Sequence, residues 1–311
     1  MIEGGSTNMP LLTTGIPQGS RIIEGLTLAN NGSGAIDIAT GICSDWTYTR
    51  LINLSTGLTA KSISSTFTVG VSGGLLDEGT VGNNTYHIYL IERPDTEVID
   101  AVGSLSNNNS GTVTISNASP AVVTWSDHGL QVGAGVTFST TGSLPTGITA
   151  GTRYYVISSG FGTGSFQISA SIGGGAVNTS SAGSGIHSAF AQPKLPTSYT
   201  YYRRIGSIIR SGGSILSFTQ YGDKFLLSSI VNDVNNVSPT TTATNYTLTI
   251  PIGINANVII NAALKNNGTA YLRVYSPTQT DVTVTLNNAN LNVGNTTAPT
   301  NEAVQLQILT N

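Results

Sequence analysis

The sequence predicts an all-β protein made of several small antiparallel β-sandwich or barrel domains, one inserted into another, with an extended N-terminal arm. Gly, Ser, Thr, Asn and the β-branched residues dominate the chain, and no window carries a sustained apolar stripe with the helical period. Apolar residues reach 39% while charged residues are only 9%. Disorder normally requires the opposite balance, so the chain should fold. Its 311 residues exceed what one core usually organises, which predicts more than one domain.

The first element is the arm, residues 1–20. It has turn-forming Gly and Pro throughout and no period that could bury a face. Such an arm is either a loose terminus or a docking segment that orders against another subunit. If it docks, its apolar residues and one proline are the candidate anchors: Met9, Pro10, Leu11, Leu12 and Ile16.

A discontinuous host β-domain follows, formed by residues 21–104 and 193–231. Alternating apolar segments separated by Gly- and Asn-rich turns predict its strands. Two strand pairs flank the interruption: Tyr86–Arg93 with Glu97–Val102 before it, and Tyr201–Arg210 with Ser214–Thr219 after it. If the intervening residues were removed, the two pairs would join into one meander, so the interruption is interpreted as an insertion.

The insertion covers residues 105–192 and is a β-module of unusual composition. It holds two formal charges, Asp127 and Arg153, and 42 of its 88 residues are Gly, Ser or Thr. Short apolar or alternating runs divided by Gly-rich turns are typical of a small barrel or sandwich. The expected strands are Thr112–Ile115, Ala121–Trp125, Val136–Phe138, Arg153–Ile157 and Ser165–Ser169.

A polar linker, residues 232–244, leads to a C-terminal unit, residues 245–311. Five alternating segments in this unit predict a compact β-sandwich of jelly-roll type. They are Tyr246–Ile250, Asn257–Asn261, Ala270–Tyr275, Val282–Leu286 and Val304–Leu309.

Ionisable residues do not gather into a catalytic pattern, so the chain is not expected to be an enzyme. His87, His128 and His187 are isolated and lack metal-ligand spacing, which predicts neither a metal site nor a cofactor. The adjacent acids Asp77 and Glu78 fit a solvated turn better than glycoside hydrolysis, because neighbouring side chains of an extended strand point to opposite faces.

Charge and hydropathy argue against nucleic acid and membrane partners. The formal net charge is −3, and the largest cluster of basic residues is the pair Arg203–Arg204. No apolar run approaches the length of a membrane span, and no secretory leader is recognisable, so assembly in a cytoplasm is expected. The single cysteine, Cys43, excludes an internal disulfide and fits a small core residue.

Tyrosines beside arginines are the strongest candidates for a recognition surface. Flat amphipathic rings next to guanidinium groups are typical of sugar-binding and protein-contact surfaces, although cross-strand packing uses the same residues. The candidate residues are Arg153, Tyr154, Tyr155, Tyr199, Tyr201 and Tyr202.

Two blocks of the sequence resemble tailed-bacteriophage virion proteins. The run Tyr86–Asp100 (YHIYLIERPDTEVID), continued after the insertion by Leu195–Ile208 (LPTSYTYYRRIGSI), resembles a block common in tail fibres and related appendages. The segment Ala121–Gly133 (AVVTWSDHGLQVG), with Leu144–Gly147 and Thr152–Ile157, is similar to a β-module that recurs in phage structural proteins. The family block usually continues directly from the Val98–Ile99 strand to the Leu195 turn, and here it is split.

The resemblance implies a non-enzymatic virion protein, namely an oligomeric tail-fibre or receptor-binding subunit in which trimers form and the arm anchors to other virion proteins. The expected partners are copies of the chain itself in a homotrimer and a host cell-surface glycan or protein during host attachment. The expected location is the virion, assembled in the bacterial host cytoplasm. The first alternative is a capsid-bound head fibre or decoration protein. The second is a polysaccharide depolymerase, which should show a long parallel β-helix with clustered carboxylates.

Overall fold

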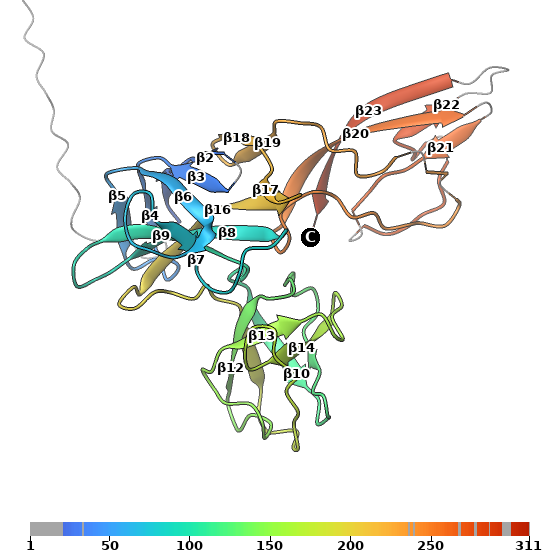
Figure 1. Ribbon diagram of the computed structural model, residues 1–311. Helices are drawn as coiled ribbons and strands as arrows, with labels where there is room; N and C mark the ends of the chain where they lie inside the picture. Colours follow the sequence, from blue (N-terminus) through green and yellow to red (C-terminus); the bar gives the residue numbers. More distant parts are fainter. Residues whose placement is uncertain are drawn as a thin grey trace, which may run out of the picture. The chain divides into compact units, whose positions relative to one another are not determined.

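The computed structural model describes residues 21–310, apart from residues 33, 236, 239, 267–268, 277–278, 286 and 294–299. It confirms the predicted all-β class, because the described residues form strands that pair into sheets and a closed barrel, and they contain no helix (Figure 1). By internal contacts the chain divides into two units, residues 1–104 with 193–228 and residues 105–192 with 229–311. The proposed anchors Met9, Pro10, Leu11, Leu12 and Ile16 lie outside the described residues. In the described part of the chain, no helix has the length and hydropathy that a membrane span requires.

The first unit contains an eight-stranded sheet in the order β17-β16-β8-β9-β7-β6-β3-β2, a three-stranded sheet β1-β4-β5 and a hairpin β18-β19. Its strands are β1 (Ile23–Gly25), β2 (Leu28–Asn30), β3 (Ala35–Ile38), β4 (Gly41–Ser44), β5 (Leu51–Leu54), β6 (Leu58–Thr66), β7 (Gly74–Leu76), β8 (Thr85–Glu92), β9 (Ile99–Ser104), β16 (Tyr201–Ser211), β17 (Ser214–Ile215), β18 (Phe218–Tyr221) and β19 (Lys224–Leu227). Pairing is antiparallel except where the short β7 lies parallel between β6 and β9.

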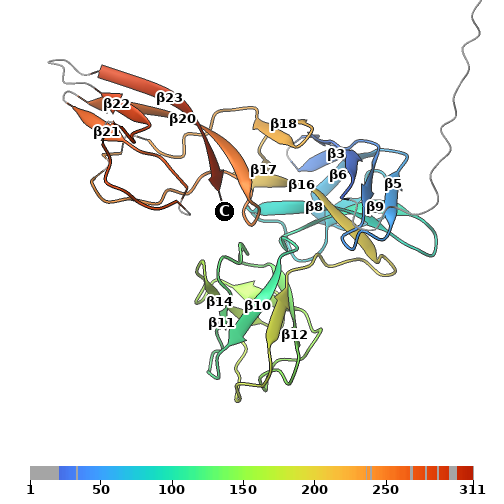
Figure 2. The same ribbon diagram turned by 180° about the vertical axis from the view of Figure 1, so that it is seen from behind.

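Strand β8 is central in this sheet and is buried along its whole length. It pairs with β9 on one side and with β16 on the other, and β16 lies beside β8 in both views (Figure 1, Figure 2). Successive side chains of β8 point to opposite faces of the sheet, and both faces are covered. Side chains on either face are therefore buried, and even His87 is fully buried. Cys43 is also fully buried, which confirms that it is a core residue.

The insertion begins after β9 and ends before β16, so the chain leaves the large sheet between two strands that both neighbour β8. Residues 105–192 form a closed barrel in the order β10-β11-β14-β13-β12-β15. Closure pairs every strand and leaves no exposed sheet edge, which suits a module with little charge. Its strands are β10 (Ser110–Ile115), β11 (Val123–Thr124), β12 (Gly135–Thr140), β13 (Tyr154–Ile157), β14 (Ser165–Ser169) and β15 (His187–Phe190).

Inward-facing side chains of the barrel strands and of the segments that connect them build one apolar core. Its buried members include Val113, Trp125, Phe138, Tyr154 and Phe166. The two ends of the insertion lie side by side, because Asn108 N donates to Ala191 O at 2.8 Å and Ala191 N donates to Asn109 O at 2.8 Å. The incoming and outgoing segments therefore pair with each other.

The C-terminal segment differs from its prediction. Its described strands are β20 (Ala256–Asn266), β21 (Ala270–Leu272), β22 (Leu291–Val293) and β23 (Thr300–Thr310). They pair as two two-stranded sheets, β20-β23 and β21-β22, so the five-stranded arrangement expected for residues 245–311 is not what the structure has. Residues 246–250 and the described residues 282–285 are not strands.

Side chains take the place of strand partners in the two missing strands. Thr249 N donates to Asp233 Oδ2 at 3.0 Å, and Thr285 N donates to Asn288 Oδ1 at 2.7 Å. Bonds of this kind compete with a β-ladder for the backbone amides. Apolar alternation predicted the right side-chain spacing, but a strand also needs a neighbour with which to pair.

Candidate functional site

The candidate residues of the barrel have structural roles. Tyr154 is 4% exposed and belongs to the core, and its hydroxyl accepts a hydrogen bond from Thr149 N at 2.9 Å. Its ring is therefore not available at the surface, contrary to its selection as a recognition residue. Tyr155 is half-buried, with the Arg153 guanidinium carbon 6.0 Å from its ring centre.

Arg153 joins the two ends of the insertion. Its Nη1 donates to Gln192 O at 2.8 Å, and its Nη2 donates to Ser106 Oγ at 3.2 Å. The guanidinium lies against the backbone of Gly135, where a Cβ would approach the Arg153 Cζ to 2.1 Å. The arginine thus serves to hold the incoming and outgoing segments together.

Two of the candidate tyrosines in the first unit are also packing residues. Tyr202 is 7% exposed and packs edge-on against Tyr89, with ring centres 6.0 Å apart. This burial removes Tyr202 from the surface, and it raises the pKa of the phenol to about 12. Tyr201 is half-buried under Arg50, whose guanidinium carbon is 5.8 Å from the ring centre and whose Nε donates to Glu92.

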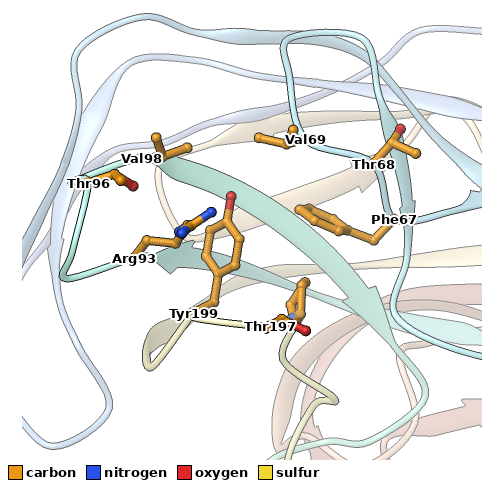
Figure 3. Close-up of a pocket in the computed structure, with 9 residues that line it drawn as sticks. Phe67, Thr68, Val69, Arg93, Thr96, Val98, Thr197 and Tyr199 are labelled. Carbon is orange, nitrogen blue, oxygen red and sulfur yellow. The ribbon is translucent and has the colours of Figure 1, made fainter.

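The remaining candidate, Tyr199, lines a surface hollow of about 610 Å³ in the first unit. Three loops form this hollow, and Figure 3 shows their side chains converging on it. The loop between β6 and β7 supplies its first wall, the turn between β8 and β9 the second, and the segment before β16 the third. The lining residues are Phe67, Thr68, Val69, Arg93, Thr96, Val98, Pro196, Thr197 and Tyr199.

A buried ion pair fixes the first wall. Lys61 and Asp100 are 0% and 1% exposed, and Lys61 Nζ lies 2.7 Å from Asp100 Oδ1. The ammonium also donates to Thr68 O and Gly70 O, both at 3.1 Å. Asp100 Oδ2 accepts from Gly70 N at 2.8 Å. The loop is thereby bonded to two charges of the sheet below it, which holds its shape without a ligand.

Backbone geometry directs Tyr199 into the hollow. Tyr199 N donates to Pro196 O at 3.1 Å, and Ser198 between them adopts a φ of 72°, in the left-handed region. The ring meets the edge of Phe67 at an interplanar angle of 80°, with centres 5.7 Å apart. In Figure 3 the hydroxyl points toward the space bordered by Val69 and Val98.

The Tyr199 hydroxyl is buried and has no hydrogen-bond partner in the protein. Such groups are rare in folded proteins, because a buried donor without a partner loses its hydrogen bonds to water and gains none in the protein. Burial is the main cause that raises the pKa of this phenol, and the Asp100 carboxylate adds to the effect. Tyr199 therefore stays neutral and keeps a proton that it can donate.

The charged groups around the hollow are compensated. Arg93 lies over Tyr199, with 6.0 Å from its guanidinium carbon to the ring centre, and donates to both carboxylate oxygens of Asp95 at 3.0 and 2.7 Å. This pair raises the pKa of Arg93 and lowers that of Asp95, because each charge stabilises the other. The Arg93–Asp95 pair beside the hollow therefore carries no net charge.

No protein-family model matches the chain, and no curated protein and no solved structure matches it. The site is therefore characterised by its own geometry.

Asp77, Glu78 and His128 form contacts within the protein. Asp77 Oδ2 accepts from Lys194 N at 2.9 Å, and Glu78 lies 3.6 Å from Lys194 Nζ, so both acids hold the segment that re-enters the first unit. His128 accepts from Leu130 N through Nδ1, which leaves its Nε2–H to donate to Gly162 O at 2.8 Å. Among the described residues, no group of three or more His, Cys, Asp and Glu could hold a metal ion.

Sequence reasoning selected Tyr199 but missed the rest of the hollow. Phe67, Val98 and Thr197 come from loops far apart in the chain, and no pattern within one segment relates them. The one available signal was Lys61, a charged residue at an inward position of an alternating strand, which must find an acid when it is buried.

Replacing Tyr199 by phenylalanine is expected to leave the free energy of unfolding unchanged or to raise it by about 1 kcal/mol, because it removes a buried donor without a partner. Urea denaturation of the full chain measures the change. Tyr86→Phe is the matched control: Tyr86 is fully buried, and its hydroxyl accepts from Gly82 N at 2.7 Å. That variant should lose about 1–3 kcal/mol. Equal losses in both variants would show that the Tyr199 hydroxyl is bonded after all.

Proposed function

We propose that this chain is a non-enzymatic structural subunit of a tailed-bacteriophage virion, an oligomeric tail-fibre or receptor-binding protein anchored by its N-terminal arm. The observation that carries the proposal is the way the fold is assembled from modules. A closed barrel interrupts the β9–β16 connection of a sheet whose β8, β9 and β16 contain the fibre-like sequence block. Proteins that display surfaces on a particle suit such a construction, because each module folds around its own core.

The use of charge supports a structural rather than a catalytic role. Buried or half-buried ionisable groups serve as ties between loops and strands: Lys61 with Asp100, Arg50 with Glu92, and Asp77 with the Lys194 backbone. A catalyst needs its ionisable groups directed at a substrate and tuned toward the working pH. In this proposal, self-association into a homotrimer and contact with a host cell-surface glycan or protein provide the function, in the virion.

Electron cryo-microscopy of intact particles tests the proposal directly. Density for this chain at the periphery of the tail or baseplate is the expected result. Density on the capsid lattice would instead assign the chain to a head fibre or decoration protein, which is the main competing function. Particles that lack the chain altogether would contradict both.

Deletion of Met1–Ser20 is expected to abolish or strongly reduce incorporation of the chain into particles, because these residues include the proposed anchors Met9, Pro10, Leu11, Leu12 and Ile16. Quantitative mass spectrometry of purified virions measures incorporation. The purified truncated protein should melt at the temperature of the full chain, which would show that the fold is intact. Incorporation at the normal level would refute the anchoring role of the arm.

A further inference from the structure

The C-terminal segment, residues 229–311, is as apolar as the rest of the chain but buries few of its apolar residues. Its 83 residues include 34 apolar ones, a share close to the 39% of the whole chain. The inserted barrel, residues 105–192, has a similar length and buries 16 apolar side chains in one core. Among the described side chains of the C-terminal segment, Leu291 is the one apolar residue that is buried. A segment of this size without a larger core does not by itself offset the entropy lost on folding.

Strand β20 shows this missing burial on both of its faces. Val258, Ile260 and Ala262 are only half-buried, and Ile259, which points to the opposite face, is 57% exposed. In the described part of the chain, β20 pairs with β23 alone, and β21 pairs with β22 alone (Figure 1). A two-stranded sheet is marginally stable in water and needs further strands or a packed face. The strands of this segment therefore lack both.

Two further stretches of the segment have the apolar alternation of strands but no strand to pair with. They are residues 246–250 and residues 282–285, and neither is a strand. Large apolar side chains in and near them are exposed, namely Tyr246, Ile252, Val282 and Val284. A second chain can supply both a neighbouring strand and an apolar cover for such stretches. The missing strands and the missing core thus have one common explanation, which is a partner that packs on this segment.

The charge of the segment indicates that this partner is a second copy of the chain. Five of the 83 residues are Asp, Glu, Lys or Arg: Asp233, Lys265, Arg273, Asp281 and Glu302. A copy brings the same charges to a symmetric contact, so a surface with little charge suits association of like with like. A partner that a segment needs for its core must also be present whenever the chain is made, and a copy of the chain always is.

We propose that the C-terminal segment is the self-association module of this protein, and that β20 is buried against the same segment of other copies. The inference rests on the proposed function, in that it names the part of the chain through which the oligomer forms. The two fail separately. A chain that imaging locates in the tail but that is monomeric in solution would overturn this inference alone, and an oligomer that is absent from particles would overturn the function alone.

Sedimentation velocity of the full-length protein at micromolar concentration tests the proposal, and the parent protein should sediment as an oligomer. Ile259→Lys introduces a charge that a single copy leaves exposed but that the interface would bury, so it should weaken association more than about tenfold. Ile259→Leu should associate like the parent. Ile172→Lys is the matched control, because this isoleucine is 50% exposed in a turn of the barrel, and it should leave association unchanged.

Hydrogen-exchange mass spectrometry of the same samples shows which part of the chain is buried on association. Peptides from β20 should exchange more slowly in the parent protein than in Ile259→Lys. Peptides from β8 and from the barrel should exchange equally in both proteins, which would show that the variant keeps its fold.

Three results would overturn the proposal. The first is a parent protein that is monomeric at micromolar concentration, which would leave the segment to a partner other than a copy of the chain. The second is an oligomer that Ile259→Lys and Ile172→Lys affect equally, which would place the interface elsewhere. The third is a variant without residues 1–20 that is monomeric while its β20 peptides exchange as in the parent protein, which would assign self-association to the arm.

Discussion

Replacing Lys61 by methionine is expected to lower the free energy of unfolding of the first unit by about 3–5 kcal/mol. Methionine fills a similar volume, but it leaves the Asp100 carboxylate buried without its countercharge and removes the donor to Thr68 O and Gly70 O. Hydrogen-exchange mass spectrometry of peptides from β8 and β9 measures this change, because it reads the first unit separately from the barrel.

Two further variants separate the buried charge from the loss of a lysine. Lys194→Met is the matched substitution at a lysine whose side chain is 54% exposed, and it should cost less than about 1 kcal/mol. The double variant Lys61→Met with Asp100→Leu should recover part of the loss, because no unpaired charge remains in the core. A Lys61→Met protein as stable as the parent would contradict the role given to this pair.

Acidification is expected to destabilise the first unit through His87, by about 1.4 kcal/mol for each pH unit below the ordinary histidine pKa. Burial, with a smaller contribution from the Arg204 charge, lowers the pKa of His87 from 6.5 to about 3. The unfolded chain therefore takes up a proton below pH 6.5 that the folded chain refuses until about pH 3. Stability is fully present above pH 6.5 and falls as the pH drops toward 3, by about 5 kcal/mol in total.

Hydrogen exchange of β8 peptides between pH 6.5 and 4.5 is the useful window, because carboxylates such as Asp45, whose pKa is lowered, titrate below it. His87→Gln removes the titrating group and should reduce the slope by about one proton, although loss of the contact between His87 Nδ1 and Ser207 Oγ lowers stability at neutral pH. His128, whose pKa burial also lowers, adds a slope of the same sign in the barrel. An unchanged slope in the β8 peptides of His87→Gln would show that His87 is not responsible.

The sequence predicted those parts of the fold in which local pattern and pairing agree. Ser165–Ser169 was expected as a strand and is β14, and Thr112–Ile115 lies within β10. In contrast, β15 (His187–Phe190) was missed, although it closes the barrel between β10 and β12. Its sequence, His-Ser-Ala-Phe, is too short and too polar to predict a strand. The segment is a strand because its backbone pairs with β10 on one side and with β12 on the other.

The candidate site shows the same limit. Tyr154 and Tyr202 carry the composition of a recognition surface, but composition does not say which side of a strand faces the core, and both rings are buried. The hollow around Tyr199 depends instead on three loops and on a buried ion pair between Lys61 and Asp100, which are distant in sequence. Such a site arises from tertiary structure, and a single sequence gives no direct signal for it.

Asn108 pairs with Ala191, and Arg153 bonds both Ser106 and Gln192, so the two ends of the insertion are joined. This closure also bears on how the protein can change in evolution. The two ends of the 105–192 segment lie side by side in the fold. Recombination at the two places in the gene that encode these ends could therefore remove the barrel, or exchange it for another module, as a single cassette. Strands β8, β9 and β16 would keep their partners through such an exchange, since their pairing includes no residue of the cassette. The inserted module can therefore be replaced while the large sheet keeps its strand pairing.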